Sequence, residues 1–195
     1  MKKFLRVLTL VSLFLLSVAP LAQTTVSAQD AVTLNLSLGA EPPTLDPALA
    51  TDSTSGSIIR NVFEGLTHNN HGEIEPGVAE SWEESEDGLT WTFTLRQDST
   101  WSNGDPVTAN DFEFAWKRAL NPETASQYAS ILYPIAGAEE FNSGEGEEDA
   151  VGVTAVDDYT LEVTLNNPTP YFLELTSFYT YMPVHQATVE ADSTG

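Results

Sequence analysis

Two histidines in the first half of the chain have the spacing of a small metal site. His68 and His71 lie three residues apart in the segment HNNH, and Glu64 and Glu73 are the nearest carboxylates. Two histidines in a polar loop are a weak indication of a metal centre. We therefore expect surface histidines here and no bound metal.

The sequence motifs of common catalytic sites are missing. The chain contains no HExxH, GxSxG, CxxC or GxxxxGKS/T sequence, and His185 stands alone. No nucleophile is paired with a nearby base. Carboxylates are abundant, so a secreted hydrolase with an Asp/Glu pair stays open as an alternative. The residues favour a binding protein over an enzyme.

The net charge of the chain disfavours two classes of binding partner. The chain has 29 acidic and 7 basic residues, a formal net charge of −22. Nucleic acid and anionic membranes are poor partners for such a surface, which is typical of a highly soluble protein. Residues 139–149, EEFNSGEGEED, lack the spacing of a calcium-binding EF-hand. We expect a flexible acidic loop there.

The first 28 residues predict an export signal. A basic start, with Lys2, Lys3 and Arg6, precedes an apolar run over residues 7–18 that is short for a membrane span. Small residues at 26–28 favour cleavage after residue 28, with residue 22 as a second candidate. A retained anchor helix is the alternative.

Cysteine is absent from the chain. An exported domain without disulfides depends on its apolar core for stability. Lipid anchoring of exported bacterial proteins also requires a cysteine, and Leu21-Ala22 is followed instead by Gln23. We predict a mature protein without a lipid anchor.

Several elements follow from hydrophobic periodicity. Residues 32–38 alternate apolar and polar side chains, which predicts a half-buried strand without an evident partner. Residues 58–66 place their apolar side chains on one helical face, with Ser55 or Ser57 as the expected N-cap. Residues 82–95, around the EDG turn, and 151–165, around Asp157-Asp158, predict two hairpins.

The segment 101–122 predicts a turn, a capped helix and a stop. Asn103-Gly104 suits the turn, and Thr108 with Asp111 resembles a capping box. Asn121-Pro122 ends the helix. One apolar face contains Phe112, Ala115, Trp116, Ala119 and Leu120. The predicted fold class is α+β, with antiparallel hairpins and few helices; residues 185–195 show no pattern of helix or strand.

Four successive blocks resemble a known family. Together they cover almost all of the chain beyond the signal and follow the family's order. They are TLDPALATDSTSGSIIRNVFEGL (44–66), GEIEPGVAESWEESEDGLTWTFTLR (72–96), WSNGDPVTANDFEFAWKRALNPETASQYAS (101–130) and AVDDYTLEVTLNNPTPYFLELTS (155–177). The sequence is similar to the oligopeptide-binding proteins, the extracytoplasmic solute-binding proteins (family 5) of peptide-type ABC transporters.

The resemblance implies a type II periplasmic-binding-protein-like fold of two lobes joined by a hinge, with an extra small domain. Residues 29–63 would begin the first lobe, 64–186 would form the small domain, and 187–195 would start the return to the first lobe. The second lobe would lie beyond this chain. The family works outside the cytoplasm, in the periplasm or cell envelope, as a monomer without a cofactor.

The resemblance also implies a ligand site. A peptide would lie extended between the lobes and pair through its backbone with Thr51 and Ser53, beside Tyr128. A membrane permease would then receive it. Thr51 stands where some members carry an acidic residue, so length and charge preference can differ. Relatives that bind nickel complexes, haem, sugars or signalling peptides are one alternative, and a structural envelope protein is another. We expect core packing, not ligand contact, for Trp82, Trp91, Trp101 and Trp116.

Overall fold

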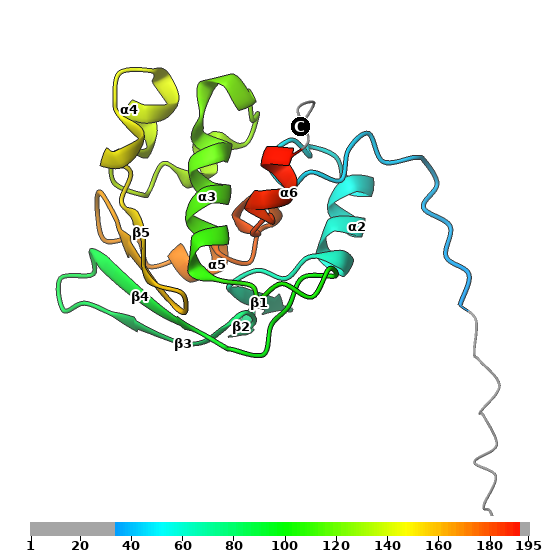
Figure 1. Cartoon of the computed structure of the whole chain (residues 1–195), viewed down its shortest axis with the longest axis horizontal. Coiled ribbons are helices and arrows are strands. Elements are labelled where there is room, and N and C mark those ends of the chain that lie inside the picture. The colour runs from blue at the N-terminus through cyan, green and yellow to red at the C-terminus, as the bar shows by residue number, and fades with distance from the viewer. Residues whose placement is uncertain (1–33, 192–195) are drawn as a thin grey trace, which may run out of the picture. The chain divides into compact units, whose positions relative to one another are not determined.

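The computed structural model describes residues 34–191 (Figure 1). The chain divides into two units: residues 34–37 are the described part of the first, and Leu38 begins the second. The predicted signal at 1–28 lies outside the described residues. Among the helices described, none has the length and apolar character needed to cross a membrane.

The strand predicted at 32–38 is not formed over its described part. Residues 34–38 have no regular structure, and the side chains of Leu34 and Leu36 are each 77% exposed. A strand needs a neighbour to pair its backbone groups, and both described sheets are built from other segments. Alternation alone does not supply that neighbour.

A four-stranded antiparallel sheet forms the centre of the second unit. Its strands are β3 (Ala79–Glu84), β4 (Thr90–Leu95), β5 (Val153–Asp157) and β6 (Thr160–Thr164), in the order β3-β4-β6-β5. Both predicted hairpins are therefore confirmed. Alternate side chains of β4 and β6 point into the core because successive residues of a strand face opposite sides. The buried set is Trp91, Phe93, Leu95, Leu161 and Val163.

Helix α3 (Ala109–Leu120) packs against this sheet on the side of β5 (Figure 1). The predicted start is confirmed, since the Asp111 carboxylate accepts the Thr108 N–H at 2.9 Å. The predicted apolar face is also buried. At its centre, the fully buried Trp116 donates its indole N–H to the carbonyl oxygen of Tyr181 at 2.8 Å.

One edge of the sheet is contacted at Ala155 by a side chain of α3. The Glu113 carboxylate accepts the backbone N–H of Ala155, on edge strand β5, at 2.7 Å. Lys117 holds the same carboxylate from the next turn of the helix at 2.6 Å. This contact satisfies a strand donor that β6 does not use.

A second, two-stranded sheet consists of β1 (Thr67–Asn70) and β2 (Glu73–Pro76). Most residues of these two strands are polar, so the sheet was not predicted from sequence. The expectation of a loop around His68 was wrong. Period-two alternation is weak here because most of these side chains are exposed. The turn between the strands has φ of 56° at His71 and 95° at Gly72, which suits a tight hairpin.

Two further segments for which no helix was predicted each contain one. Part of the acidic segment 139–149 lies in α4 (Ala138–Ser143), and residues 186–191 form α6 (Gln186–Ala191). In α4, Asn142 donates to the carbonyl oxygen of Leu120 and accepts from the Tyr133 hydroxyl, both at 2.7 Å. These contacts between distant residues, which composition does not reveal, attach α4 to the end of α3.

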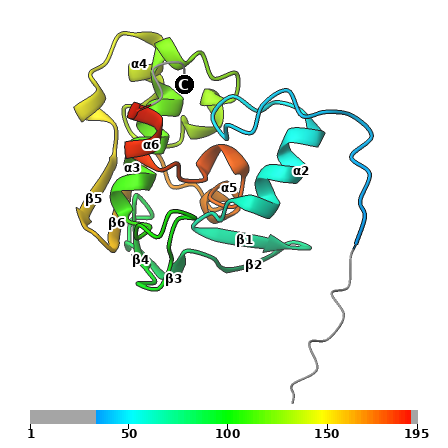
Figure 2. The same cartoon turned by 45° about the vertical axis from the view of Figure 1, so that its right-hand side comes forward.

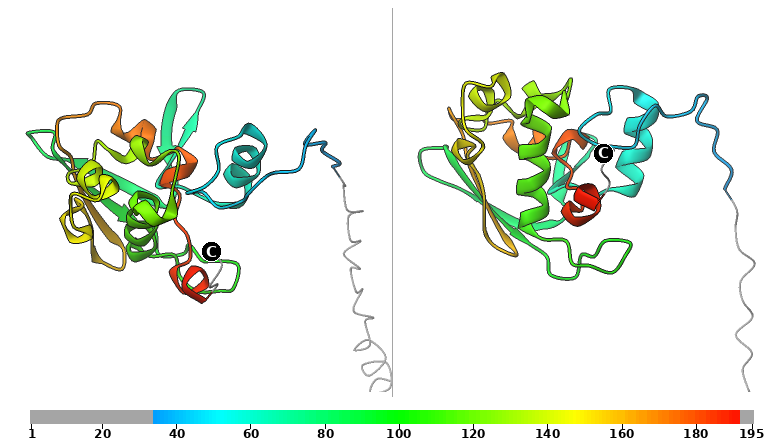
Figure 3. Two further views of the ribbon diagram at one scale, coloured as in Figure 1. Left: turned by 90° about the horizontal axis from the view of Figure 1, so that it is seen from above. Right: turned by 45° about the horizontal axis from the view of Figure 1, so that its top comes forward.

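The remaining elements join α2 (Ser53–Val62) to the core. After α5 (Phe172–Leu175), the chain runs between α2 and α3 (Figures 2 and 3). That stretch contains the 3-10 turn Tyr179–Tyr181, which contacts both helices. The other 3-10 turns are Pro122–Thr124, Ala129–Leu132 and Glu148–Ala150.

Candidate ligand-binding site

The loop before α2 is fixed in place from the α3 side. The Arg118 guanidinium forms two hydrogen bonds with the Asp46 carboxylate, at 3.0 and 2.6 Å. Asp46 also accepts the Ala48 N–H at 2.9 Å, and the Ser126 hydroxyl donates to the Ala48 carbonyl at 2.6 Å. Because both carboxylate oxygens of Asp46 are engaged, the residues that follow have a defined path.

Helix α2 begins earlier than predicted. Its N-cap is Asp52, whose carboxylate accepts the N–H groups of Thr54 and Ser55, each at 2.9 Å. Hydrogen bonding to Ser55 lowers the pKa of the Asp52 carboxyl below its ordinary value. The expected caps, Ser55 and Ser57, are instead inside the helix, because aspartate upstream supplies a strong cap.

The end of α2 also differs from the prediction. Phe63 is its C-cap, so Leu66 lies outside the helix, although it is buried. Ile59 is fully buried as expected, but the side chain of Val62 is 64% exposed. The apolar residues of 58–66 therefore do not share one helical face.

The structure brings the predicted ligand-binding residues together. Thr51 and Ser53 are exposed, one on each side of the Asp52 cap. The Tyr128 hydroxyl donates to the Thr51 carbonyl oxygen at 3.3 Å. Ser53 is the first residue of α2, a position whose N–H has no acceptor within the helix. Backbone groups and an aromatic side chain thus share one exposed area.

Two aromatic residues that the sequence reasoning missed pack around Tyr128, beside this area. The ring centroids of Phe178 and Tyr179 are 4.2 Å apart, and those of Tyr128 lie 5.9 and 6.2 Å from them. Tyr179 packs against α2 at Gly56, where an added Cβ would lie 3.0 Å from the tyrosine ring. The aromatic-rich segment SFYTY was the only sequence signal for these residues.

Burial changes the acidity of one of these tyrosines. The pKa of Tyr179 is raised to about 12, first because the phenol is buried and then because of the neighbouring Tyr128. The phenol therefore stays protonated to a higher pH than an ordinary tyrosine side chain.

Alkaline solution should reduce stability through Tyr179. The unfolded chain, with the ordinary pKa of 10.0, releases this proton before the folded protein, with about 12. The contribution is fully present below the first value and is lost as pH rises through the second. In denaturant unfolding across this range, Tyr179→Phe should lose stability less steeply than the wild type. Tyr171→Phe, at a residue 56% exposed, should follow the wild type; identical profiles for all three proteins would contradict the assignment.

A largely apolar groove of about 630 Å³ borders the Asp46 loop. It is bounded by that loop, the end of α2, the turn at 100–103 and the start of α6. Its apolar lining consists of Leu45, Pro47, Val62, Phe63, Trp101, Val184 and Val189. The groove is separate in character from the polar backbone area around Thr51.

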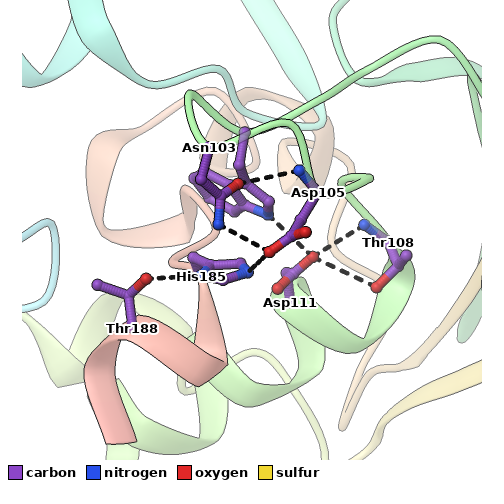
Figure 4. A network of polar contacts seen from close by, with 7 residues as sticks. Asn103, Asp105, Thr108, Asp111, His185 and Thr188 are labelled. Atoms are coloured by element: carbon purple, nitrogen blue, oxygen red, sulfur yellow. Dashed lines mark hydrogen bonds and ion pairs between the residues drawn. The ribbon is translucent and has the colours of Figure 1, made fainter. Parts of the chain in front are cut away.

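His185, at the edge of this groove, does not stand alone (Figure 4). Its Nε2 atom is 3.1 Å from the Asp105 carboxylate, and its Nδ1 atom is 2.6 Å from the Thr188 hydroxyl. The ring also lies 5.7 Å, between centroids, from Trp101. The network fastens the start of α6 to the turn at 101–105. In the described residues, no three histidine or carboxylate groups are placed to hold a metal.

The solved structures that share this fold are type II periplasmic binding proteins, the class that the sequence resemblance implied. The family described as bacterial extracellular solute-binding proteins, family 5 (middle), matches residues 73–195. The chain belongs to this family, so the resemblance and the predicted fold class are confirmed.

Three relatives indicate how far the similarity extends. The oligopeptide-binding protein OppA of Bacillus subtilis is 58% identical over 159 residues, covering 81% of this chain and 29% of the relative. The substrate-binding domain of a Bacillus anthracis oligopeptide ABC transporter is 47% identical with a TM-score of 0.77, covering 78% of this chain and 30% of that one. Haemophilus influenzae OppA in complex with the peptide RPPGFSPFR is 42% identical with a TM-score of 0.77, covering 80% and 31%.

Proposed function

We propose that this protein is the extracytoplasmic substrate-binding component of an ABC importer. It captures oligopeptides in extended form and delivers them to a membrane permease. The chain spans about 29% of the length of the first of these relatives, and the activity is proposed for the whole protein. The observation that carries the proposal is that the exposed residues Thr51 and Ser53 lie together at the start of α2, beside Tyr128.

Backbone pairing explains how such a site accepts many sequences. Every peptide has the same main-chain donors and acceptors, so an added strand is held without regard to its side chains. In this proposal, the Thr51 and Ser53 backbone groups pair with the peptide, and Tyr128 contacts it from the side. Ordered water in the pockets adapts to different side chains.

Closure of two lobes on the peptide supplies the signal for delivery. A ligand that contacts both lobes only in the closed form shifts the hinge equilibrium towards closure. The closed protein then docks on the permease as a monomer. This step needs no cofactor and no hydrolytic activity of the chain itself.

The domain boundaries are part of the proposal. Residues 1–28 are the export signal, 29–63 begin the first lobe, 64–186 form the small domain, and 187–195 return to the first lobe. The apolar groove described above supports this division. It lies beside residues of the segments that enter and leave the small domain, and a lobe packed there would cover exposed side chains such as Leu45 and Val62. The mature protein is placed in the periplasm or cell envelope, without a lipid anchor.

Mass spectrometry of the bound ligand tests the function. The full-length protein, purified from the envelope of its own cells and then denatured, should release short peptides of mixed sequence. Release of a nickel complex, haem or sugar would instead favour the alternative ligands of this fold. Peptide or glycan turnover that disappears on changing one Asp/Glu pair would favour a hydrolase.

A variant of Tyr128 connects that result to the site. Tyr128→Ala should retain less peptide, with an affinity about fivefold to tenfold lower, because a large aromatic contact is removed. Tyr171→Ala is the matched control, since this tyrosine is exposed and has no contact with Thr51. Equal retention by both variants would contradict the role of Tyr128.

A further inference from the structure

Arg60 differs from the other basic residues of the described chain. It is exposed on α2 and makes no ion pair with any described carboxylate. The other basic residues each have a carboxylate partner: Arg96 with Glu64, Lys117 with Glu113, and Arg118 with Asp46. In a chain of net charge −22, an arginine without such a partner is exceptional.

The position of Arg60 connects it to the candidate site. Gly56 and Arg60 are four residues apart, so they lie on the same face of α2. A Cβ added at Gly56 would be 3.4 Å from the Arg60 Nη1 atom and 3.0 Å from the Tyr179 ring. The guanidinium and the phenol ring therefore both pack close to Gly56, which has no side chain to displace them. The charge of Arg60 also opposes, in part, the rise in the pKa of Tyr179.

We propose that Arg60 binds a carboxylate of the peptide ligand, and that it thereby selects peptides carrying a negative charge at one position. The inference rests on the proposed function and names a preference of the same site. Arginine suits this role because its planar guanidinium matches a carboxylate with two parallel hydrogen bonds.

Helix geometry specifies where that carboxylate lies on the peptide. Seven residues separate Ser53 from Arg60, which is about 10 Å along the helix axis at ~1.5 Å per residue. An extended peptide covers this distance in about three residues. The carboxylate is therefore expected about three residues from the peptide residue that pairs with Thr51 and Ser53. It is either the carboxyl terminus of a short peptide or an acidic side chain of a longer one.

The net negative charge of the protein explains why a contact between Arg60 and a peptide carboxylate would matter. A strongly negative protein repels anionic ligands at long range. A cation beside the peptide path offsets that repulsion at one point. Arg60 also lies in the last turn of α2, where a positive charge stabilises the helix dipole. If this interaction with the helix dipole were the only role of Arg60, a variant without the charge would be less stable but would keep the same peptide preference.

Calorimetric titration of the full-length protein with matched peptides tests the proposal. One pair is a tetrapeptide with a free carboxyl terminus and its carboxamide; a second pair is a longer peptide with glutamate or glutamine at the expected position. In the wild type, at least one carboxylate peptide should bind about threefold to tenfold more tightly than its neutral partner. Arg60→Gln should abolish that preference by weakening binding of the carboxylate peptide only.

Controls separate the preference from general charge and stability. Arg96→Gln removes the same charge at a residue already paired with Glu64, and should keep the wild-type preference. Arg60→Lys should keep part of the preference for carboxylate peptides, because the positive charge remains but the two parallel hydrogen bonds of the guanidinium are lost. Equal binding of charged and neutral peptides by the wild type, or an unchanged preference in Arg60→Gln, would overturn the role of Arg60. If the wild type binds no peptide of either kind, the proposed function itself fails.

Discussion

Trp116→Ala is expected to lower the free energy of unfolding by about 3–5 kcal/mol, the range for large buried aromatic side chains. Trp116 is fully buried in the face of α3, and its ring meets that of Tyr181 edge-on with centroids 4.9 Å apart. Truncation would open a cavity and also remove the hydrogen bond from the indole N–H to the Tyr181 carbonyl. Chemical denaturation of the purified mature protein measures the loss.

Trp82 provides a control of the same residue type. It lies on edge strand β3 and is only partly buried, so Trp82→Ala should cost much less than Trp116→Ala. Similar losses in the two variants would mean that the contacts of Trp116 with Tyr181 do not anchor the core as the structure indicates.

Breaking the Asp46–Arg118 pair should have the second largest effect. The two side chains are only 23% and 12% exposed, so removing one leaves the other partly buried without its charge partner. We expect Arg118→Met to lower the free energy of unfolding by about 2–3 kcal/mol. In the full-length protein it should also weaken peptide binding, because the Asp46 loop leads directly into Thr51.

A double-mutant cycle isolates the pair. Asp46→Asn keeps an oxygen for the Ala48 N–H but removes the charge, so the double variant with Arg118→Met should be more stable than the sum of the single losses predicts. Lys117→Met is the control, since it breaks a pair of the same helix that does not contact the loop. Strictly additive losses for Asp46 and Arg118 would show that the two side chains do not stabilise each other.

The elements predicted well are those whose signals are local. In α3, the cap, the apolar face and the proline stop lie within one short segment, so the helix could be placed from sequence. In the hairpin β3–β4, the returning strand β4 likewise shows strict alternation after the EDG turn. By contrast, the β1–β2 hairpin has polar residues at most positions. The N-cap of α2 was misplaced because several residues near its start, Asp52 among them, have side chains that can cap a helix.

The candidate site was predictable only through family resemblance. Thr51 and Ser53 are ordinary polar residues before a helix, and nothing in their spacing marks them as ligand contacts. Their proximity to Tyr128 depends on the loop that Arg118 holds from a distant part of the chain. Tyr179 and Arg60 could not be connected to the site from sequence, since their meeting at Gly56 requires the packing of the turn after α5 on α2.

The Glu113 contact at the sheet edge has a consequence for aggregation. A free edge strand recruits any extended polypeptide through its unpaired backbone groups. Here the outward N–H of Ala155 is already occupied by a carboxylate that Lys117 holds in place. A second, unfolded copy of the chain therefore meets an ion pair instead of a free donor at Ala155. Strand addition is therefore discouraged at this position of the sheet edge, where one glutamate of α3 works against self-association.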